Sequence, residues 1–143
     1  MNKELAVKKT LEIKADTLDV WDALINPEKI KQYFFGIDVI SDWKVGSSIL
    51  FQYKMEGKEF KDKGNILAIE PGRFLQYNYW SSYSGLEDKE DNYSIVTYKI
   101  DTKDEGTILN LTQQGFANEQ AKEHAENSWG MVLKNLKELV EKE

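Results

Sequence analysis

The sequence predicts an α+β fold, in which a curved antiparallel sheet of six to seven strands wraps around a long C-terminal helix, with two short helices after the first strand. Two different hydrophobic periods in the sequence predict this arrangement. Apolar residues recur every three or four positions over residues 118–141, which is typical of an amphipathic helix, whereas they alternate with period two through much of residues 37–113. Short turns between the strands favour an antiparallel meander. Such a sheet twists and curls, so the long helix is expected to fill its concave face.

The chain is expected to begin with a strand and two short helices. Residues 7–15 alternate between apolar and mostly charged side chains, as in a half-buried strand. Residues 16–17 supply an aspartate or a threonine as the cap of a first helix, which runs to about Ile25. Pro27 suits the first position of a second helix, which is expected to end at Gly36.

Strands follow with the same alternation of apolar and polar residues. They are expected over residues 37–40, 48–55, 59–70, 73–80, 92–101 and 107–113. Glu56-Gly57-Lys58 and Pro71-Gly72 are typical turn sequences between them. Gly64 lies inside the third of these strands and predicts a bulge or a bend. Residues 81–91 are polar and acidic, so we expect a loop there.

The long helix is expected to run from a cap at Asn118 to Glu141, and its apolar stripe changes character along its length. The first half of the stripe consists of Ala121, Ala125 and Ser128, whereas residues 132–140 supply bulky side chains. A sheet packed on this face closes tightly over the bulky half. The sequence therefore predicts spare volume over the small half.

Composition limits the class of protein. The 143 residues fit a single domain, residues 1–143, and a chain of this length buries roughly 70% of its unfolded surface. The net charge of −6 argues against nucleic acid as a partner, which requires a basic surface. No apolar run approaches the roughly 20 residues of a membrane span, so no membrane insertion is expected. The polar start lacks a signal-peptide core, and we expect a cytoplasmic protein and a monomer.

Few residue types are present that could hold a metal or perform catalysis. With one histidine, His124, and no cysteine, no zinc site is expected, and no phosphate-binding motif indicates a cofactor. The acidic residues of 87–91 lack the spacing of a calcium loop, and Lys89 interrupts them. His124 has no carboxylate neighbour at helical spacing, so a catalytic role is weakly supported and no catalytic residue is assigned.

Short motifs dispersed along nearly the whole chain resemble one known family. They are Val20-Trp21-Asp22-Ala23-Leu24, Asn26-Pro27-Glu28, Gln32-Tyr33-Phe34, Asp42-Trp43-Lys44-Val45-Gly46-Ser47, Asp62-Lys63-Gly64-Asn65-Ile66-Leu67, Glu70-Pro71, Phe74-Leu75-Gln76-Tyr77, Gly106-Thr107-Ile108-Leu109-Asn110-Leu111, Ser128-Trp129-Gly130 and Leu133-Lys134-Asn135-Leu136-Lys137. This set resembles the homologues of the activator of heat-shock protein 90 ATPase, within the helix-grip superfamily of START-like and pollen-allergen-like domains. The resemblance implies a helix-grip domain. It also implies either binding of a small hydrophobic ligand or a chaperone-associated role in the stress response.

Aromatic side chains are the best candidates for a binding site. By alternation they lie on or near the concave side of the sheet, opposite the small half of the helix. The candidate ligand-binding residues are Tyr33, Phe34, Phe51, Tyr53, Tyr77, Tyr79, Tyr98, Ala121, Ala125, Ser128 and Trp129. The same side chains can instead make a solid core. Buried tyrosine hydroxyls need hydrogen-bond partners, and this favours a pocket for a lipid-like or aromatic ligand.

Two other functions remain open at this point. A chaperone-associated protein would use the outer face of the sheet, where Leu50, Phe74 and Trp80 are the candidate contacts. An enzyme similar to the cyclases of the superfamily would depend on His124 and the tyrosines. Non-catalytic binding is favoured over both.

Overall fold

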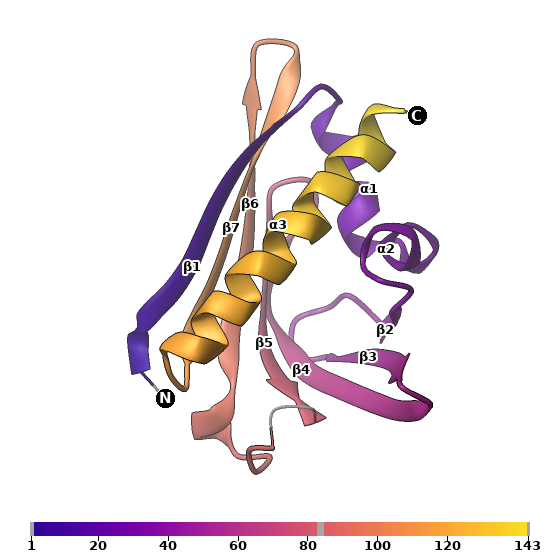
Figure 1. Ribbon diagram of the computed structural model, residues 1–143. Helices are drawn as coiled ribbons and strands as arrows, with labels where there is room; N and C mark the ends of the chain where they lie inside the picture. The colour runs from indigo at the N-terminus through magenta and orange to yellow at the C-terminus, as the bar shows by residue number, and fades with distance from the viewer. Residues whose placement is uncertain (1, 83–84, 143) are drawn as a thin grey trace.

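A computed structural model describes residues 2–82 and 85–142 and shows one curved sheet with all the α-helices on its concave side (Figure 1). The seven strands are antiparallel in the order β1-β7-β6-β5-β4-β3-β2. They span Asn2–Ile13 (β1), Asp38–Ser41 (β2), Ser48–Met55 (β3), Lys58–Glu70 (β4), Phe74–Ser81 (β5), Ser94–Lys103 (β6) and Gly106–Phe116 (β7). The helices span Thr17–Ile25 (α1), Pro27–Tyr33 (α2) and Glu119–Glu141 (α3), and Glu90–Asn92 forms a single 3₁₀ turn, η2. The predicted architecture is confirmed.

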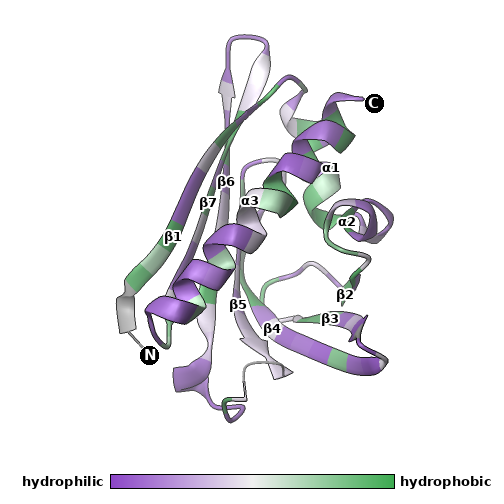
Figure 2. Cartoon of the chain, viewed as in Figure 1, coloured by the Kyte–Doolittle hydropathy of each residue, from purple (hydrophilic) through white to green (hydrophobic). Residues whose placement is uncertain are grey.

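Helix α3 crosses the concave face, and its two halves differ as the sequence predicts. The Asn118 side chain caps the helix by accepting a hydrogen bond from the Ala121 amide at 2.9 Å. The buried residues lie from Trp129 onward, and Leu136 has 0% exposure. Figure 2 shows the N-terminal half of α3 as mostly hydrophilic, and hydrophobic segments appear further along it. The C-terminal half is therefore the part that anchors the helix to the core.

Helices α1 and α2 close one end of the concave face. Pro27 is the first residue of α2, and the Asn26 side chain accepts a hydrogen bond from the Glu28 amide at 3.0 Å. The Tyr33 hydroxyl donates to the Ala23 carbonyl at 2.8 Å and ties α2 to α1. The helix ends at Tyr33, earlier than the predicted Gly36, because Phe34 already leaves the helical region with φ −113° and ψ 57°, and Phe35 follows with a φ of 53°.

Strand β4 contains Gly64, where the sequence predicts a bulge or a bend. The register of β4 against β5 shifts between Ile66 and Ala68, so the bulge lies beyond Gly64. A Cβ atom on Gly64 would lie 1.7 Å from the Asn78 carbonyl oxygen of β5. Gly64 is therefore required because the two backbones come too close for any side chain.

The strand ends differ from the predicted ones by a few residues. Strand β1 begins at Asn2, and β7 continues to Phe116, because their outer segments pair with each other through Asn2↔Phe116 and Ala6↔Gln114. Backbone pairing therefore extends both strands beyond the residues in which apolar and polar side chains alternate. Within residues 2–82 and 85–142, no helix is both long enough and apolar enough to cross a membrane.

Candidate functional site

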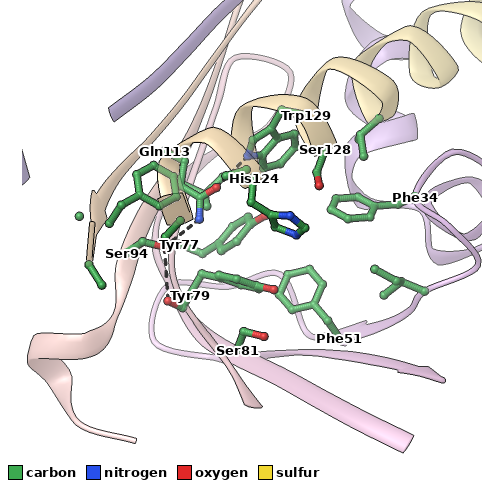
Figure 3. Close-up of a pocket in the computed structure, with 18 of the residues that line it drawn as sticks. Phe34, Phe51, Tyr77, Tyr79, Ser81, Ser94, Gln113, His124, Ser128 and Trp129 are labelled. Atoms are coloured by element: carbon green, nitrogen blue, oxygen red, sulfur yellow. Dashed lines mark hydrogen bonds between the residues drawn. The ribbon is translucent and has the colours of Figure 1, made fainter. Parts of the chain in front are cut away.

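A cavity of about 370 Å³ lies between the sheet and the N-terminal half of α3, and it is open to solvent on one side. The predicted residues that line it are Phe34, Phe51, Tyr53, Tyr77, Tyr79, Ala121, Ala125, Ser128 and Trp129. The sheet contributes aromatic rings, and α3 contributes small side chains opposite them (Figure 3). The volume thus lies where the side chains of the helix are shortest.

Two of the predicted site residues lie elsewhere. Tyr33 is the last residue of α2, and Tyr98 lies on the part of the sheet that α1 and α2 cover. Both are buried, and neither lines the large cavity. The Tyr98 ring packs edge-to-face on Trp129, with the ring centroids 6.0 Å apart. Both tyrosines belong to the core that supports the cavity.

Sequence reasoning missed several cavity residues. The exposed ones at its opening are Phe35, Leu86, Ala117 and His124, and the remaining ones are Ile37, Ser81, Asn92, Ser94, Val96, Gln113, Gly115, Phe116 and Val132. Alternation places Ser94 and Val96 on the inward face, so a signal for them existed. Phe35, Leu86 and Ala117 come from turns, loops and strand ends, where periodicity carries no information.

A chain of hydrogen bonds joins α3 to the floor of the cavity (Figure 3). The Trp129 indole nitrogen donates to Gln113 Oε1 at 2.7 Å, and Gln113 Nε2 donates to Ser94 Oγ at 2.9 Å. Ser94 Oγ in turn donates to the Tyr79 carbonyl at 3.4 Å. Because Trp129, Gln113 and Ser94 are all buried, these bonds satisfy polar groups that water does not reach. They fix the position of the indole ring.

A second polar cluster centres on Asp62, which is 3% exposed. The Tyr79 hydroxyl donates to Asp62 Oδ2, and the Tyr53 hydroxyl donates to Oδ1 at 3.2 Å. Burial raises the pKa of Asp62, and hydrogen bonds from Tyr79, Ser81, Tyr53 and the Ser82 amide oppose this shift. Burial, and then the Asp62 carboxylate, raise the pKa of Tyr79 well above its ordinary value, so this hydroxyl keeps its proton.

The raised pKa of Asp62 predicts a pH-dependent stability difference. The folded state holds the Asp62 proton more tightly than the unfolded chain, so this group's stabilising contribution is lost as pH rises from 3.8 through the folded pKa. We therefore expect the free energy of unfolding of Asp62→Asn to increase relative to that of the wild type as the pH rises through this range. Urea titrations of both proteins from pH 3.5 to neutral would measure the difference. A constant difference across these pH values would contradict the assignment.

Two polar side chains of α3 point into the cavity from the opposite wall. Figure 3 shows His124 and Ser128 directed toward its interior, facing Phe34 and the tyrosines. Neither side chain makes a hydrogen bond or an ion pair within the part of the chain that the structure describes. His124 therefore lacks the orienting partner of a general base. Among the same residues, no group of three His, Cys, Asp or Glu side chains is arranged to hold a metal ion.

The outer face of the sheet contains the candidate chaperone contacts. Leu50, Phe74 and Trp80 are each half-buried. The Trp80 indole nitrogen donates to the Leu86 and Glu87 carbonyls, and the Lys63 ammonium lies 5.8 Å from the ring centroid. Both the edge and a face of this ring are thus engaged within the chain.

Solved structures show how widely this fold occurs. The solution structure of ChR145 from Cytophaga hutchinsonii aligns with a TM-score of 0.85 and 37% identity, over 99% of this chain and 97% of that one. The crystal structure of CV1439 from Chromobacterium violaceum aligns with a TM-score of 0.79 and 21% identity, over 96% and 98% of the two chains. The Aha1 dimer from Colwellia psychrerythraea aligns with a TM-score of 0.76 and 16% identity, over 95% and 96%. At these lower identities, the last two likenesses concern the fold alone.

Two sequence comparisons gave different results. No curated protein matches the chain. A family model does match it, over residues 14–141, and it is described as activator of Hsp90 ATPase homolog 1-like protein. That range includes both short helices, β2 to β7 and the long helix that bounds the cavity. The chain therefore belongs to the family of activator of Hsp90 ATPase homolog 1-like proteins.

Proposed function

We propose that this protein binds one small, mostly apolar molecule, aromatic or lipid-like, in the cavity between the sheet and α3. The supporting observation is the cavity itself, with a volume of about 370 Å³ and a lining rich in aromatic rings. Pockets for small molecules typically begin at roughly 300 Å³ and combine apolar walls with a few placed polar groups. The Asp62 cluster and the two polar side chains of α3 supply such groups here.

The packing of the rings explains why the cavity persists without collapsing. The Phe51 ring lies edge-to-face against Tyr79, with centroids 5.5 Å apart, and Phe34 contacts Trp129 in the same manner at 5.7 Å. The hydroxyl of Tyr79 and the indole of Trp129 are each held by a hydrogen bond. Rings that are fixed at both face and edge form a rigid wall, which lowers the entropic cost of binding a ligand.

The other functions receive less support. Of the candidate chaperone contacts on the outer face, Leu50, Phe74 and Trp80 are all half-buried, and Trp80 already makes its contacts within the chain. An enzyme would require acid–base groups aligned with a substrate, and His124 lies at the exposed rim without an orienting carboxylate among the described residues. We therefore propose a binding protein, monomeric and cytoplasmic, rather than a catalyst.

Filling the cavity from α3 is expected to abolish ligand binding. In Ala125→Phe the new ring would occupy the space beneath the helix, because Ala125 lines the cavity. Thermal shift and native mass spectrometry against panels of lipids and polyphenols would measure binding. At a free ligand concentration of about 100 times Kd, the wild type gains about 2.7 kcal/mol of stability. The variant is expected to gain almost none.

Asn127→Phe is the matched control for this experiment. It adds the same ring to the same helix, but Asn127 is exposed and lies outside the cavity lining. We expect it to bind ligand like the wild type. If Ala125→Phe folds and still binds as tightly as Asn127→Phe, or if no compound shifts the wild-type melting temperature, the proposed function is wrong.

A further inference from the structure

The hydroxyl hydrogens of Tyr53 on β3 and Tyr79 on β5 point to Asp62 and away from the interior of the cavity. Tyr79 donates its hydroxyl hydrogen to Asp62 Oδ2, and Tyr53 donates its own to Oδ1. Both tyrosines line the cavity, whereas Asp62 lies behind them and is 3% exposed. A hydroxyl group has a single hydrogen, so the Tyr79 oxygen, once it has donated, offers only lone pairs to a ligand.

The surroundings of Asp62 fix this direction of donation. The Ser82 backbone amide donates to Oδ1 at 3.2 Å, and an amide hydrogen has no other role than donation. The Ser81 side chain also hydrogen-bonds this carboxylate. Turning the Tyr79 hydrogen into the cavity would leave the buried Oδ2 atom without that donor, which is costly for a buried charge. The carboxylate therefore holds Tyr79 as an acceptor.

An amide at the same side of the cavity is oriented in the same sense. Asn92 lines the cavity, and its Nδ2 atom donates to the Glu87 carbonyl at 2.8 Å. A carbonyl oxygen only accepts hydrogen bonds, so the amide nitrogen must face Glu87. This bond commits one of the two amide hydrogens of Asn92 and leaves its Oδ1 atom as a further acceptor.

The other polar groups of the lining are either engaged within the chain or able both to donate and to accept. Ser94 donates its hydroxyl hydrogen to the Tyr79 carbonyl, and one of the two Gln113 amide hydrogens goes to Ser94 Oγ. His124, Ser128 and Tyr77, whose hydroxyl accepts a hydrogen bond from Tyr98, can each still donate or accept, so they discriminate little between ligand groups. The discrimination therefore arises at Tyr79, next to a buried carboxylate.

We propose that the cavity selects ligands that donate a hydrogen bond, namely neutral aromatic or lipid-like molecules that carry a hydroxyl or an N–H group. This inference rests on the proposed ligand-binding function. The donor group of the ligand meets the Tyr79 oxygen, and the apolar body packs against Phe51 and Trp129. A matched ether cannot make this bond, and a carboxylate would bring a second negative charge toward Asp62.

Naphthalene derivatives that differ in one group test this selectivity. Isothermal titration of the wild type with 2-naphthol, 2-methoxynaphthalene and 2-naphthoate compares a neutral donor, an acceptor and an anion on one ring system. We expect 2-naphthol to bind about tenfold more tightly than the methyl ether, as one hydrogen bond in a desolvated site allows. The naphthoate is expected to bind more weakly than 2-naphthol.

Removing the Tyr79 hydroxyl is expected to abolish the preference. In Tyr79→Phe the ratio of the two dissociation constants should approach one, while the affinity for the methyl ether stays close to that of the wild type. Tyr93→Phe is the matched control, because the Tyr93 hydroxyl also donates to a carboxylate, that of Asp88, but Tyr93 does not line the cavity. It should keep the wild-type ratio.

Asp62→Asn provides a second variant and tests Asp62 as a positioning residue. Its oxygen can still accept from the Ser82 amide, and its nitrogen then faces the Tyr79 hydroxyl and donates to it. The Tyr79 hydrogen is thereby released toward the cavity. We expect the wild type to bind 2-naphthol more tightly than the acceptor 2-acetonaphthone, and Asp62→Asn to bind these two compounds in the reverse order. A purely structural role for Asp62 predicts no such reversal.

The outcomes separate the two proposals. Equal affinity of the wild type for 2-naphthol and its methyl ether would overturn donor selection and leave ligand binding intact. A preference that survives in Tyr79→Phe would also overturn it. If the wild type binds none of these probes and none of the lipids and polyphenols, both the selectivity and the proposed function fail.

Discussion

Gly64→Ala is expected to destabilise the protein by about 3 kcal/mol or more, which is a large fraction of the stability of a domain of this size. The added Cβ atom would lie 1.7 Å from the Asn78 carbonyl oxygen, far inside van der Waals contact. That oxygen belongs to the backbone of β5, so no side-chain rotation relieves the clash. Strands β4 and β5 must therefore separate at this position to admit the methyl group. Urea unfolding followed by circular dichroism would measure the loss.

Gly130→Ala is the control for this prediction, and the opposite sign is expected. Gly130 lies on the exposed side of α3, and a Cβ atom there would meet no atom within 4 Å. Alanine in an exposed helix interior stabilises by about 1 kcal/mol relative to glycine. If both variants change the free energy of unfolding by the same small amount, the close approach of β4 and β5 is not a constraint on the fold.

Leu136→Ala is the second substitution for which we expect a large effect, a loss of about 3 to 5 kcal/mol. Leu136 is 0% exposed on the face of α3 that packs into the sheet, so truncation removes buried contacts and leaves an apolar void. The neighbouring Val132, Leu133 and Val140 are buried as well, which limits how far the helix can settle into the gap. The midpoint of urea unfolding should fall accordingly.

Met131→Ala tests whether burial, rather than helix composition, causes this loss. Met131 lies on the same helix, is 54% exposed, and changes to the same residue. We expect a shift within about 0.5 kcal/mol. Comparable losses in the two variants would show that α3 contributes through its local helical preference and not through its contact with the sheet. Leu136 does not line the cavity, so its folded variant should still bind ligand.

Most of the fold was predictable because two periods dominate the sequence. The alternation around Phe51, Tyr77 and Tyr98 places each of these side chains on the concave face, and the structure confirms that they are buried. The change from small to bulky residues along α3 also located the spare volume. Strand ends were less accurate, since β1 and β7 extend through backbone pairing that hydrophobic alternation does not register.

The cavity lining was predictable only in part, because alternation gives the face of a strand and not what covers it. Tyr98 is inward, but its position along β6 brings it near α1 and α2, whereas Val96 lies two residues closer to the cavity. Phe35 reaches the opening through a backbone conformation with positive φ, which composition does not indicate for phenylalanine.

Asp62 illustrates a signal that was present but easily overlooked. Counting back in steps of two from the buried Ile66 passes Gly64 and arrives at Asp62, so the inward direction of this carboxylate follows from period two alone. Its partners could not be foreseen in the same way. Tyr53 and Tyr79 lie on β3 and β5, and their approach to Asp62 depends on the register of three strands.

The position of Trp129 gives the molecule a built-in optical reporter. Its indole ring forms part of the cavity wall, whereas Trp21, Trp43 and Trp80 lie elsewhere in the described chain. Occupancy would bring the ligand against that indole and change its surroundings, while the hydrogen bond to Gln113 keeps the ring in place. A shift in emission wavelength on titration would therefore come from Trp129 and require no added dye.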